Sequence, residues 1–283
     1  MITNSVKGGF QLSPESLVLP SMKNPVQGVS ETTFSDLSPD LLAEIKQIKQ
    51  ISEIEKISLQ SKAWVLFDID DTVTMPQCRA FQNFEQDKRY QKLWTQCAVE
   101  KRELLPSIVI SSSPRVLVSQ DIPGSIAQLQ KDGYTALGCT ATPTSSFYNV
   151  SILKWREEEL KRLGVVFTQK GSSKVFDQFA SHRGTFPIFQ EGVLYTNMNV
   201  SKGDAIVALL DHLNESPSQI LLIDDLLENI LNVQETMKKR AIPFLGLHFL
   251  PIQEEGAVSD EEWYKAWGPV CKYIQGGKLS ERK

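Results

Sequence analysis

The sequence predicts a doubly wound α/β fold, in which helices cover both faces of a mainly parallel sheet. Short apolar runs alternate with helical segments along the chain, and several of these runs end in acidic or hydroxyl residues. The first run, Trp64–Phe67, is apolar at every position, as is typical of a central strand buried on both faces. Alternation of strands and helices favours a parallel sheet over an all-helical or all-β fold.

The segment before the first strand predicts a helix that begins at Ser38, where serine can cap and Pro39 suits the first turn. The apolar residues of this helix recur at helical spacing, at Leu41, Leu42, Ile45, Ile48 and Ile51. Residues 1–37 are rich in serine, proline, glycine and asparagine. We expect them to form a flexible N-terminal arm.

The chain after Trp64–Phe67 continues the alternation. Further strands are predicted at 134–139, 165–167, 220–223 and 244–249, and helices at 123–132, 150–163, 202–213 and 226–240. Residues 168–199 combine glycines with alternating apolar positions, which predicts a loop with a hairpin. This order of elements is typical of an open, Rossmann-like sheet.

The predicted domain organisation is one core domain, 38–250, with an insertion at 75–122. The insertion is helix-like over 81–105 and strand-like at Ile108–Ile110, so we expect a small, mainly helical cap. Residues 251–283 predict an amphipathic C-terminal helix, which carries Trp263 and Trp267, and a tail.

Composition excludes several classes of protein. The 283-residue chain has a formal net charge of −4. It lacks the excess of basic residues that is typical of proteins that bind nucleic acid or an anionic membrane. The four cysteines and three histidines are scattered, which favours reduced thiols over disulfides or a zinc site. The N-terminus lacks the apolar region of a secretory signal, and no apolar run is long enough to span a bilayer. We therefore expect a soluble, cytoplasmic protein.

Polar side chains follow the ends of several predicted strands, where ligands bind in open α/β sheets. The residues concerned are Asp68, Asp70, Asp71 and Thr72 after the first strand, Thr140 after 134–139, Asp224 and Asp225 after 220–223, and Lys202 at the start of a helix. Two carboxylates 4 Å apart repel by about 4 kcal/mol at an effective dielectric constant near 20. Such a cluster is tolerable only with a bound cation, a lysine, or both, and all-oxygen ligands suit Mg²⁺. The sequence therefore predicts a site for magnesium and phosphate.

Other interpretations of these residues remain open. The run from Asp68 to Thr72 could cap a helix, although Val73 and Arg79 stand where a calcium loop needs glycine and glutamate. Ser111–Ser113 also follow an apolar run and compete with Thr140. We favour Thr140, because a helix, a glycine and a strand precede it.

Four of these segments resemble, in order, the motifs of the haloacid dehalogenase (HAD) superfamily. They are Phe67-Asp68-Ile69-Asp70-Asp71-Thr72, the strand that ends in Thr140, Lys202-Gly203-Asp204, and Asp224-Asp225 with Asn229. The resemblance covers about residues 60 to 250. The stretches LFDIDDT, LGCTATP and SQILLIDDLLENI are similar to a little-characterised branch found largely in intracellular bacteria. Asp71 departs from the glycine of many relatives, and Thr142 and Pro143 stand where that branch often has arginine.

The resemblance implies a Mg²⁺-dependent phosphatase. Asp68 would attack phosphorus and form an aspartyl-phosphate, and Asp70 would protonate the leaving oxygen and later activate water. Thr140 and Lys202 would bind phosphoryl oxygens. The metal ligands implied are Asp68, the backbone carbonyl of Asp70, and Asp225, with Asp224 either a ligand or the neighbour of one.

The substrate is not specified by the sequence. A small cap suits a phosphoprotein, including phosphotyrosine, while a small metabolite and a phosphomutase reaction are alternatives within the superfamily. A binding protein with a vestigial site is a further alternative. The likeness to intracellular bacteria also allows delivery into a host cell, and the oligomeric state is open.

Overall fold

The computed structural model describes residues 43–82, 84, 87–98, 113–147, 150–251 and 257–274. Its main sheet has eight strands: β1 Ile45–Ile48, β2 Trp64–Phe67, β5 Thr135–Thr140, β8 Lys174–Val175, β9 Ile188–Gln190, β10 Val193–Tyr195, β11 Ile220–Asp224 and β12 Phe244–Phe249. Their order across the sheet is β1-β12-β11-β2-β5-β10-β9-β8. Strand β9 is antiparallel to both neighbours, and the other pairs are parallel.

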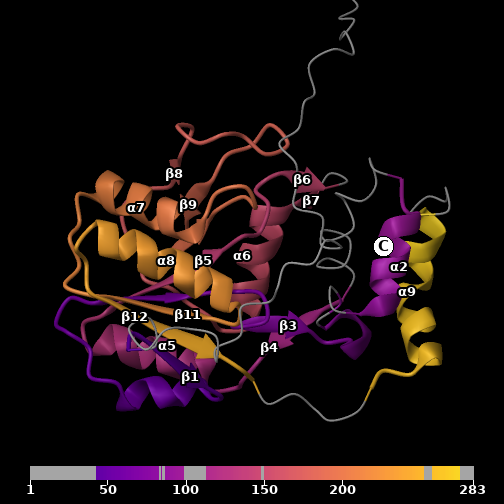
Figure 1. The fold of residues 1–283 in the computed structure, drawn as a ribbon, viewed down its shortest axis with the longest axis horizontal. Helices are drawn as coiled ribbons and strands as arrows, with labels where there is room; N and C mark the ends of the chain where they lie inside the picture. The colour runs from indigo at the N-terminus through magenta and orange to yellow at the C-terminus, as the bar shows by residue number, and fades with distance from the viewer. Residues whose placement is uncertain are drawn as a thin grey trace, which may run out of the picture. The chain divides into compact units, whose positions relative to one another are not determined.

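Helices cover both faces of this sheet (Figure 1). They are η2 Ile51–Lys56, α5 Ile122–Lys131, α6 Ile152–Arg162, α7 Lys202–Leu213 and α8 Leu227–Lys239. Because side chains of a strand alternate between faces, Val65 and Phe67 pack with η2, α5 and α6, whereas Trp64 and Leu66 pack with α7 and α8. The predicted α/β fold, with a mainly parallel sheet between two layers of helices, is confirmed.

The strand order fixes where a site can form. From β2 the chain builds β5 and then β10 on one side of β2, and it returns to build β11 and β12 on the other side. The direction of winding therefore reverses between β2 and β11. In doubly wound sheets, the crevice for a ligand lies at such a reversal, outside the carboxyl ends of the strands.

The predicted helix that begins at Ser38 is wrong over its described part. Ile45 and Ile48 lie instead in strand β1, parallel to β12, and Ile51 begins the short 3₁₀ helix η2. A spacing of three residues puts two side chains on one face of a helix but on opposite faces of a strand. Ile45 packs on the α8 face and Ile48 on the α5 face, so this edge strand fills both layers.

The strand predicted at 165–167 is also wrong. In the described part of the chain, the backbone hydrogen bond that joins this region to β5 comes just after 165–167, where Thr168 N–H donates to Ala136 O at 2.8 Å. Strand β10 takes the position next to β5, because it turns back from β9 in a hairpin at Glu191 and Gly192, both with positive φ. The predicted hairpin within 168–199 is thereby confirmed.

The insertion leaves the core through an antiparallel pair, β3 (Thr74–Pro76) and β4 (Arg115–Leu117). Between them lie a 3₁₀ helix, η3 (Arg79–Phe81), and α2 (Lys88–Gln96). The C-terminal helix α9 (Asp260–Ile274) lies beside α2 in Figure 1. Its Trp263 and Trp267 are buried in a separate cluster with Phe81 and Tyr90 of the insertion. The insertion and α9 therefore share one small apolar core.

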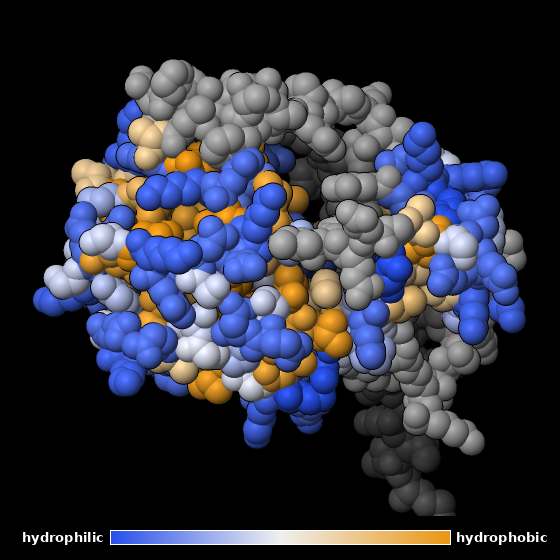
Figure 2. All heavy atoms as spheres, turned by 90° about the horizontal axis from the view of Figure 1, so that it is seen from below, coloured by the Kyte–Doolittle hydropathy of each residue, from blue (hydrophilic) through white to orange (hydrophobic). Residues whose placement is uncertain are grey.

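The surface of the described residues is mainly hydrophilic on the face that Figure 2 shows, with apolar side chains between the polar ones. None of the described helices is long and apolar enough to cross a membrane. All four cysteines have free thiols. The predicted N-terminal arm, the strand-like Ile108–Ile110 and the tail after residue 275 lie outside the described residues.

Candidate functional site

Three carboxylates meet at the reversal between β2 and β11. Asp68, Asp224 and Asp225 each offer a carboxylate oxygen within 4.8 Å of the others. The cause is the parallel register, which pairs Phe67 with Ile223 and so brings the next residues side by side. The Asp68 N–H continues the ladder and donates to Ile223 O at 2.9 Å. The sheet therefore assembles the acidic cluster that the sequence predicts.

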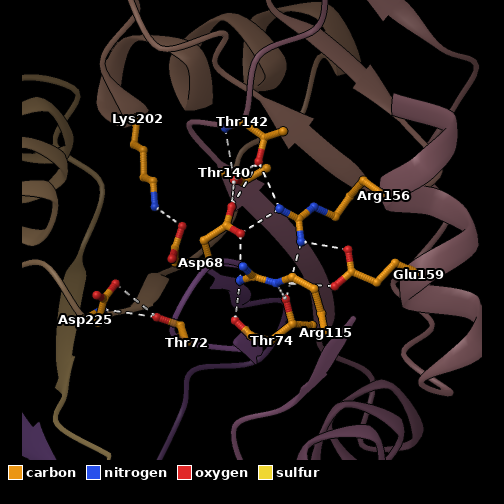
Figure 3. Close-up of polar contacts among 11 residues, drawn as sticks. Asp68, Thr72, Thr74, Arg115, Thr140, Thr142, Arg156, Glu159, Lys202 and Asp225 are labelled. Carbon is orange, nitrogen blue, oxygen red and sulfur yellow. Dashed lines mark hydrogen bonds and ion pairs between the residues drawn. The ribbon is translucent and has the colours of Figure 1, made fainter. Parts of the chain in front are cut away.

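Lys202 lies among these acids, as its place at the start of a helix predicts. Its Nζ is 2.5 Å from Asp68 Oδ1 (Figure 3) and 2.6 Å from Asp224 Oδ2. The Ser201 side chain caps α7 by accepting from Asp204 N–H at 3.1 Å, which fixes the first turn from which Lys202 extends. The buried ammonium thus bridges two of the three carboxylates.

The two acids after β11 have different surroundings. Asp224 is fully buried, and its oxygens accept from Lys202, from Asn229 Nδ2 at 3.0 Å and from Leu226 N–H at 2.9 Å. Asp225 is only partly buried. Its N–H donates to Thr72 Oγ1 at 3.1 Å, and its carboxylate lies 3.4 Å from the same hydroxyl. Asp224 is therefore enclosed by donors, and Asp225 is the less enclosed acid.

The net negative charge of the cluster favours a bound cation. Burial raises the pKa of Asp68 to about 7, although Lys202 opposes the rise. Burial and the neighbouring charges of Asp68 and Asp224 raise the pKa of Asp225 to about 9. When ionised, three carboxylates and one ammonium leave two negative charges. A divalent ion with a preference for oxygen ligands fits both this charge and these donors.

Asp70 points to a different set of partners. Its Oδ1 is 2.6 Å from Arg156 and 2.8 Å from Arg115, and its Oδ2 accepts from Thr142 Oγ1 at 3.0 Å and Thr140 Oγ1 at 3.3 Å. Burial raises the pKa of Asp70, but the two guanidinium groups outweigh it and hold this pKa well below its usual range. Asp70 and Thr140 therefore lie close together, as the sequence leads us to expect.

Sequence reasoning missed the arginines and Glu159. One signal was available, because Arg156 follows Ile152 by four residues and precedes Leu160 by four, so it lies on the buried stripe of α6. A charged residue on such a stripe needs a buried partner. No comparable pattern marks Arg115 in its three-residue strand.

Two other expectations concern neighbours of these residues. Ser113, from the rival serine run, does not join the site; its Oγ accepts from Cys78 N–H at 3.0 Å, and Ser111 and Ser112 lie outside the described residues. Asp71, where many relatives of the resemblance have glycine, has φ 61°. This left-handed conformation favours glycine and tolerates aspartate.

Comparison with known proteins gives one family. Residues 44–275 match a family model described as DUF2608, protein of unknown function. A solved structure, the HAD domain of effector protein Lem4 from Legionella pneumophila (inactive mutant), is similar over 77% of this chain and 98% of its own, with 12% identity and a TM-score of 0.32. No curated protein matches. Because the family model spans most of the described residues, from just before β1 to the end of α9, the chain belongs to the DUF2608 family.

Proposed function

We propose that this protein is a Mg²⁺-dependent phosphatase of the haloacid dehalogenase type, which hydrolyses phosphate monoesters through an aspartyl-phosphate on Asp68. One observation carries the proposal: Lys202 bridges Asp68 and Asp224 at 2.5 and 2.6 Å beside the third acid, Asp225. The order of the four sequence motifs supports the same reaction.

The metal ligands in this proposal are Asp68, Asp225 and the backbone carbonyl of Asp70. We favour Asp225 over Asp224 because the oxygens of Asp224 already accept from Lys202, Asn229 and Leu226 N–H. Bound Mg²⁺ would offset the negative charge of the carboxylates and of the phosphoryl group.

The protein's own groups perform the chemistry in two steps. In the first, an oxygen of Asp68 attacks phosphorus and the ester P–O bond breaks; the leaving oxygen takes a proton from Asp70 where that carboxyl is protonated and departs as an anion where it is not. In the second, Asp70 takes a proton from water, which attacks phosphorus and releases phosphate and free Asp68. Lys202 and the Thr140 hydroxyl donate hydrogen bonds to the phosphoryl oxygens and so stabilise the charge that spreads over them.

The proposed substrate is an aryl phosphate such as phosphotyrosine. Asp70 is ion-paired with two arginines, which hold its pKa below the usual range and favour its ionised form, so it seldom carries a proton for the leaving oxygen. A phenol has a pKa near 10, so a phenolate leaves with less help from an acid than an alkoxide does.

The decisive test is hydrolysis of p-nitrophenyl phosphate with and without Mg²⁺. We expect turnover only with Mg²⁺, and a loss of more than about 10³-fold in Asp68→Asn. Asp132→Asn is the matched control, because exposed Asp132 follows α5 at the opposite edge of the sheet. Equal turnover by Asp68→Asn and wild type would refute the nucleophile, and no turnover at all would favour the vestigial binding protein.

Two further measurements refine the assignment. Borohydride reduction during turnover should convert the phosphorylated residue 68 to homoserine, which peptide mass spectrometry detects. A panel of phosphotyrosine, phosphoserine and sugar phosphates should favour phosphotyrosine, whereas a strong preference for sugar phosphates would contradict the proposed substrate class. Release of inorganic phosphate distinguishes hydrolysis from transfer to a sugar by a phosphomutase.

A further inference from the structure

Four side chains form a closed ring of alternating charge beside the acidic cluster. Arg156 is 2.6 Å from Asp70 and 3.1 Å from Glu159, and Arg115 is 2.8 Å from Asp70 and 3.5 Å from Glu159. Figure 3 shows both guanidinium groups between Glu159 and the Asp68 region of the site. Two positive and two negative charges make the ring neutral.

The depth of the ring is unusual for charged groups. The side chains of Arg156, Arg115 and Glu159 are 0%, 3% and 5% exposed, whereas that of Asp70 is 28% exposed. Buried ion pairs cost so much desolvation that apolar side chains of similar volume often stabilise a protein as well or better. The ring is therefore a poor device for stability alone. Asp70, the residue proposed to transfer a proton, is the only member of the ring that is more than a tenth exposed.

The two arginines reach Asp70 from different elements. Arg156 extends from α6, and Arg115 extends from β4, the strand that closes the insertion. Thr74 of β3 joins them, since its Oγ1 accepts from Arg115 Nε at 3.1 Å and Arg156 at 3.3 Å. Its carbonyl also accepts from Arg115 at 2.7 Å. The hydrogen bonds to Thr74 thus fix the positions of both guanidinium groups independently of their contacts with Asp70.

The Asp70 carboxylate is held on both oxygens. Two guanidinium groups donate to Oδ1, and the hydroxyls of Thr140 and Thr142 donate to Oδ2. Rotation of this carboxylate would break several charge-assisted hydrogen bonds at once. Because a misplacement of about 1 Å can cost about 10²-fold in rate, such restraint matters for a group that transfers a proton.

We propose that Arg156 and Arg115 are positioning residues, which hold the Asp70 carboxylate in the orientation that proton transfer requires. This inference rests on the proposed phosphatase reaction and adds two residues that its motifs do not contain. In this role each arginine acts through Asp70, with which both are ion-paired. The planar fork of arginine is essential to the role, because lysine carries the charge without the paired donors.

A double-mutant cycle separates positioning from simple support of the fold. With p-nitrophenyl phosphate, we expect Arg156→Met to lower kcat by about 10²-fold with little change in KM. In an Asp70→Asn background, the same substitution should cause almost no further loss, because the group it positions is gone. Losses that multiply in the double variant would overturn the inference.

Two more variants complete the experiment. Arg156→Lys should keep most of the thermal stability while kcat stays low, and recovery of full kcat would contradict the need for a fork. Arg240→Met removes an arginine that pairs with Asp211 at the amino-terminal edge of the sheet, and it should leave kcat unchanged. If Arg156→Met does not fold, Arg115→Met replaces it in the cycle, since Arg115 contacts the same oxygen of Asp70.

The outcomes distinguish this inference from the function on which it rests. No turnover by the wild-type protein would overturn the proposed function and the inference with it. Turnover that needs Asp68 but shows additive losses for Arg156 and Asp70 would leave the phosphatase intact and overturn the positioning role alone.

Discussion

Lys202 Nζ lies 2.5 Å from Asp68 Oδ1, although 134 residues separate them along the chain. The same ammonium lies 2.6 Å from Asp224, so one cation serves two carboxylates. Of the three carboxylates, Asp225 has its negative charge balanced least by nearby positive charge. This imbalance predicts that the proposed Mg²⁺ would stabilise the folded protein in addition to supporting the proposed reaction.

Magnesium should therefore raise the melting temperature. An ion that binds only the folded state at ten times its Kd adds about 1.4 kcal/mol, which corresponds to roughly 3–6 °C for a domain of this size. Differential scanning fluorimetry in Mg²⁺, against NaCl of equal ionic strength, measures the shift. Asp225→Asn should abolish the shift and Asp132→Asn should preserve it; an equal shift in Asp225→Asn would place the ion elsewhere.

Without Mg²⁺, stability should fall as the pH rises from about 4 to 9. The pKa values of Asp68 and Asp225, about 7 and about 9, lie above the value near 3.9 in an unfolded chain. Across this range these two carboxyls bind more protons in the folded protein than in the unfolded chain, so their contribution to the free energy of unfolding decreases with pH.

Urea unfolding in EDTA at several pH values measures this dependence. Asp225→Asn removes one of the two groups and should give a shallower decrease than wild type, while other titrating groups are common to both proteins. Identical pH dependence in the two proteins would show that Asp225 is ionised without an ion. Saturating Mg²⁺ should flatten the wild-type profile.

Trp267→Ala should loosen the insertion together with α9. Trp267 is fully buried among the aromatic rings of the cluster and donates from Nε1 to Ala80 O at 2.8 Å, so its loss should cost this unit about 3–5 kcal/mol. Hydrogen exchange should quicken in both α2 and α9 while β2 and β11 stay protected. Tyr264→Ala, at a position 60% exposed on the same helix, is the control; faster exchange in α9 alone would mean that α2 does not depend on it.

Two glycine substitutions should have opposite signs. A Cβ at Gly246 of β12 would lie 2.3 Å from Cγ2 of buried Ile230, and the overpacking should destabilise Gly246→Ala by about 1–3 kcal/mol. At Gly124, exposed in α5, a Cβ meets nothing within 4 Å, and Gly124→Ala should stabilise by about 0.5–1 kcal/mol. Chemical denaturation measures both, and a neutral Gly246→Ala would show that α8 can move away from the sheet.

The acidic part of the candidate site was predictable because strand ends mark it. Apolar runs that stop at Asp68, Thr140 and Asp224 locate the carboxyl edge of a parallel sheet without knowledge of the strand order. The strand order, in turn, depends on contacts between distant segments. This is why Val165–Phe167 resembles a strand by composition, yet β10 pairs with β5.

The ring around Asp70 could not be predicted in the same way. Arg115 belongs to the stem of the insertion and Arg156 to a helix beyond the next strand, and no spacing within either element indicates their meeting. Only the packing of α6 against the β3–β4 pair brings them together. Local patterns therefore identify the groups proposed to do chemistry, while the groups that hold them emerge from the tertiary structure.

The shared core of the insertion and α9 has a consequence for biosynthesis. Tyr90 and Trp267 have ring centroids 5.4 Å apart, but nearly the whole sheet is translated between them. At a translation rate of about 5–20 residues per second, the aromatic side chains of the insertion remain without their partner helix α9 for on the order of 10–30 s. We expect ribosome-bound chains stalled before Trp263 to be cleaved by protease within α2, and chains released after α9 to resist cleavage there.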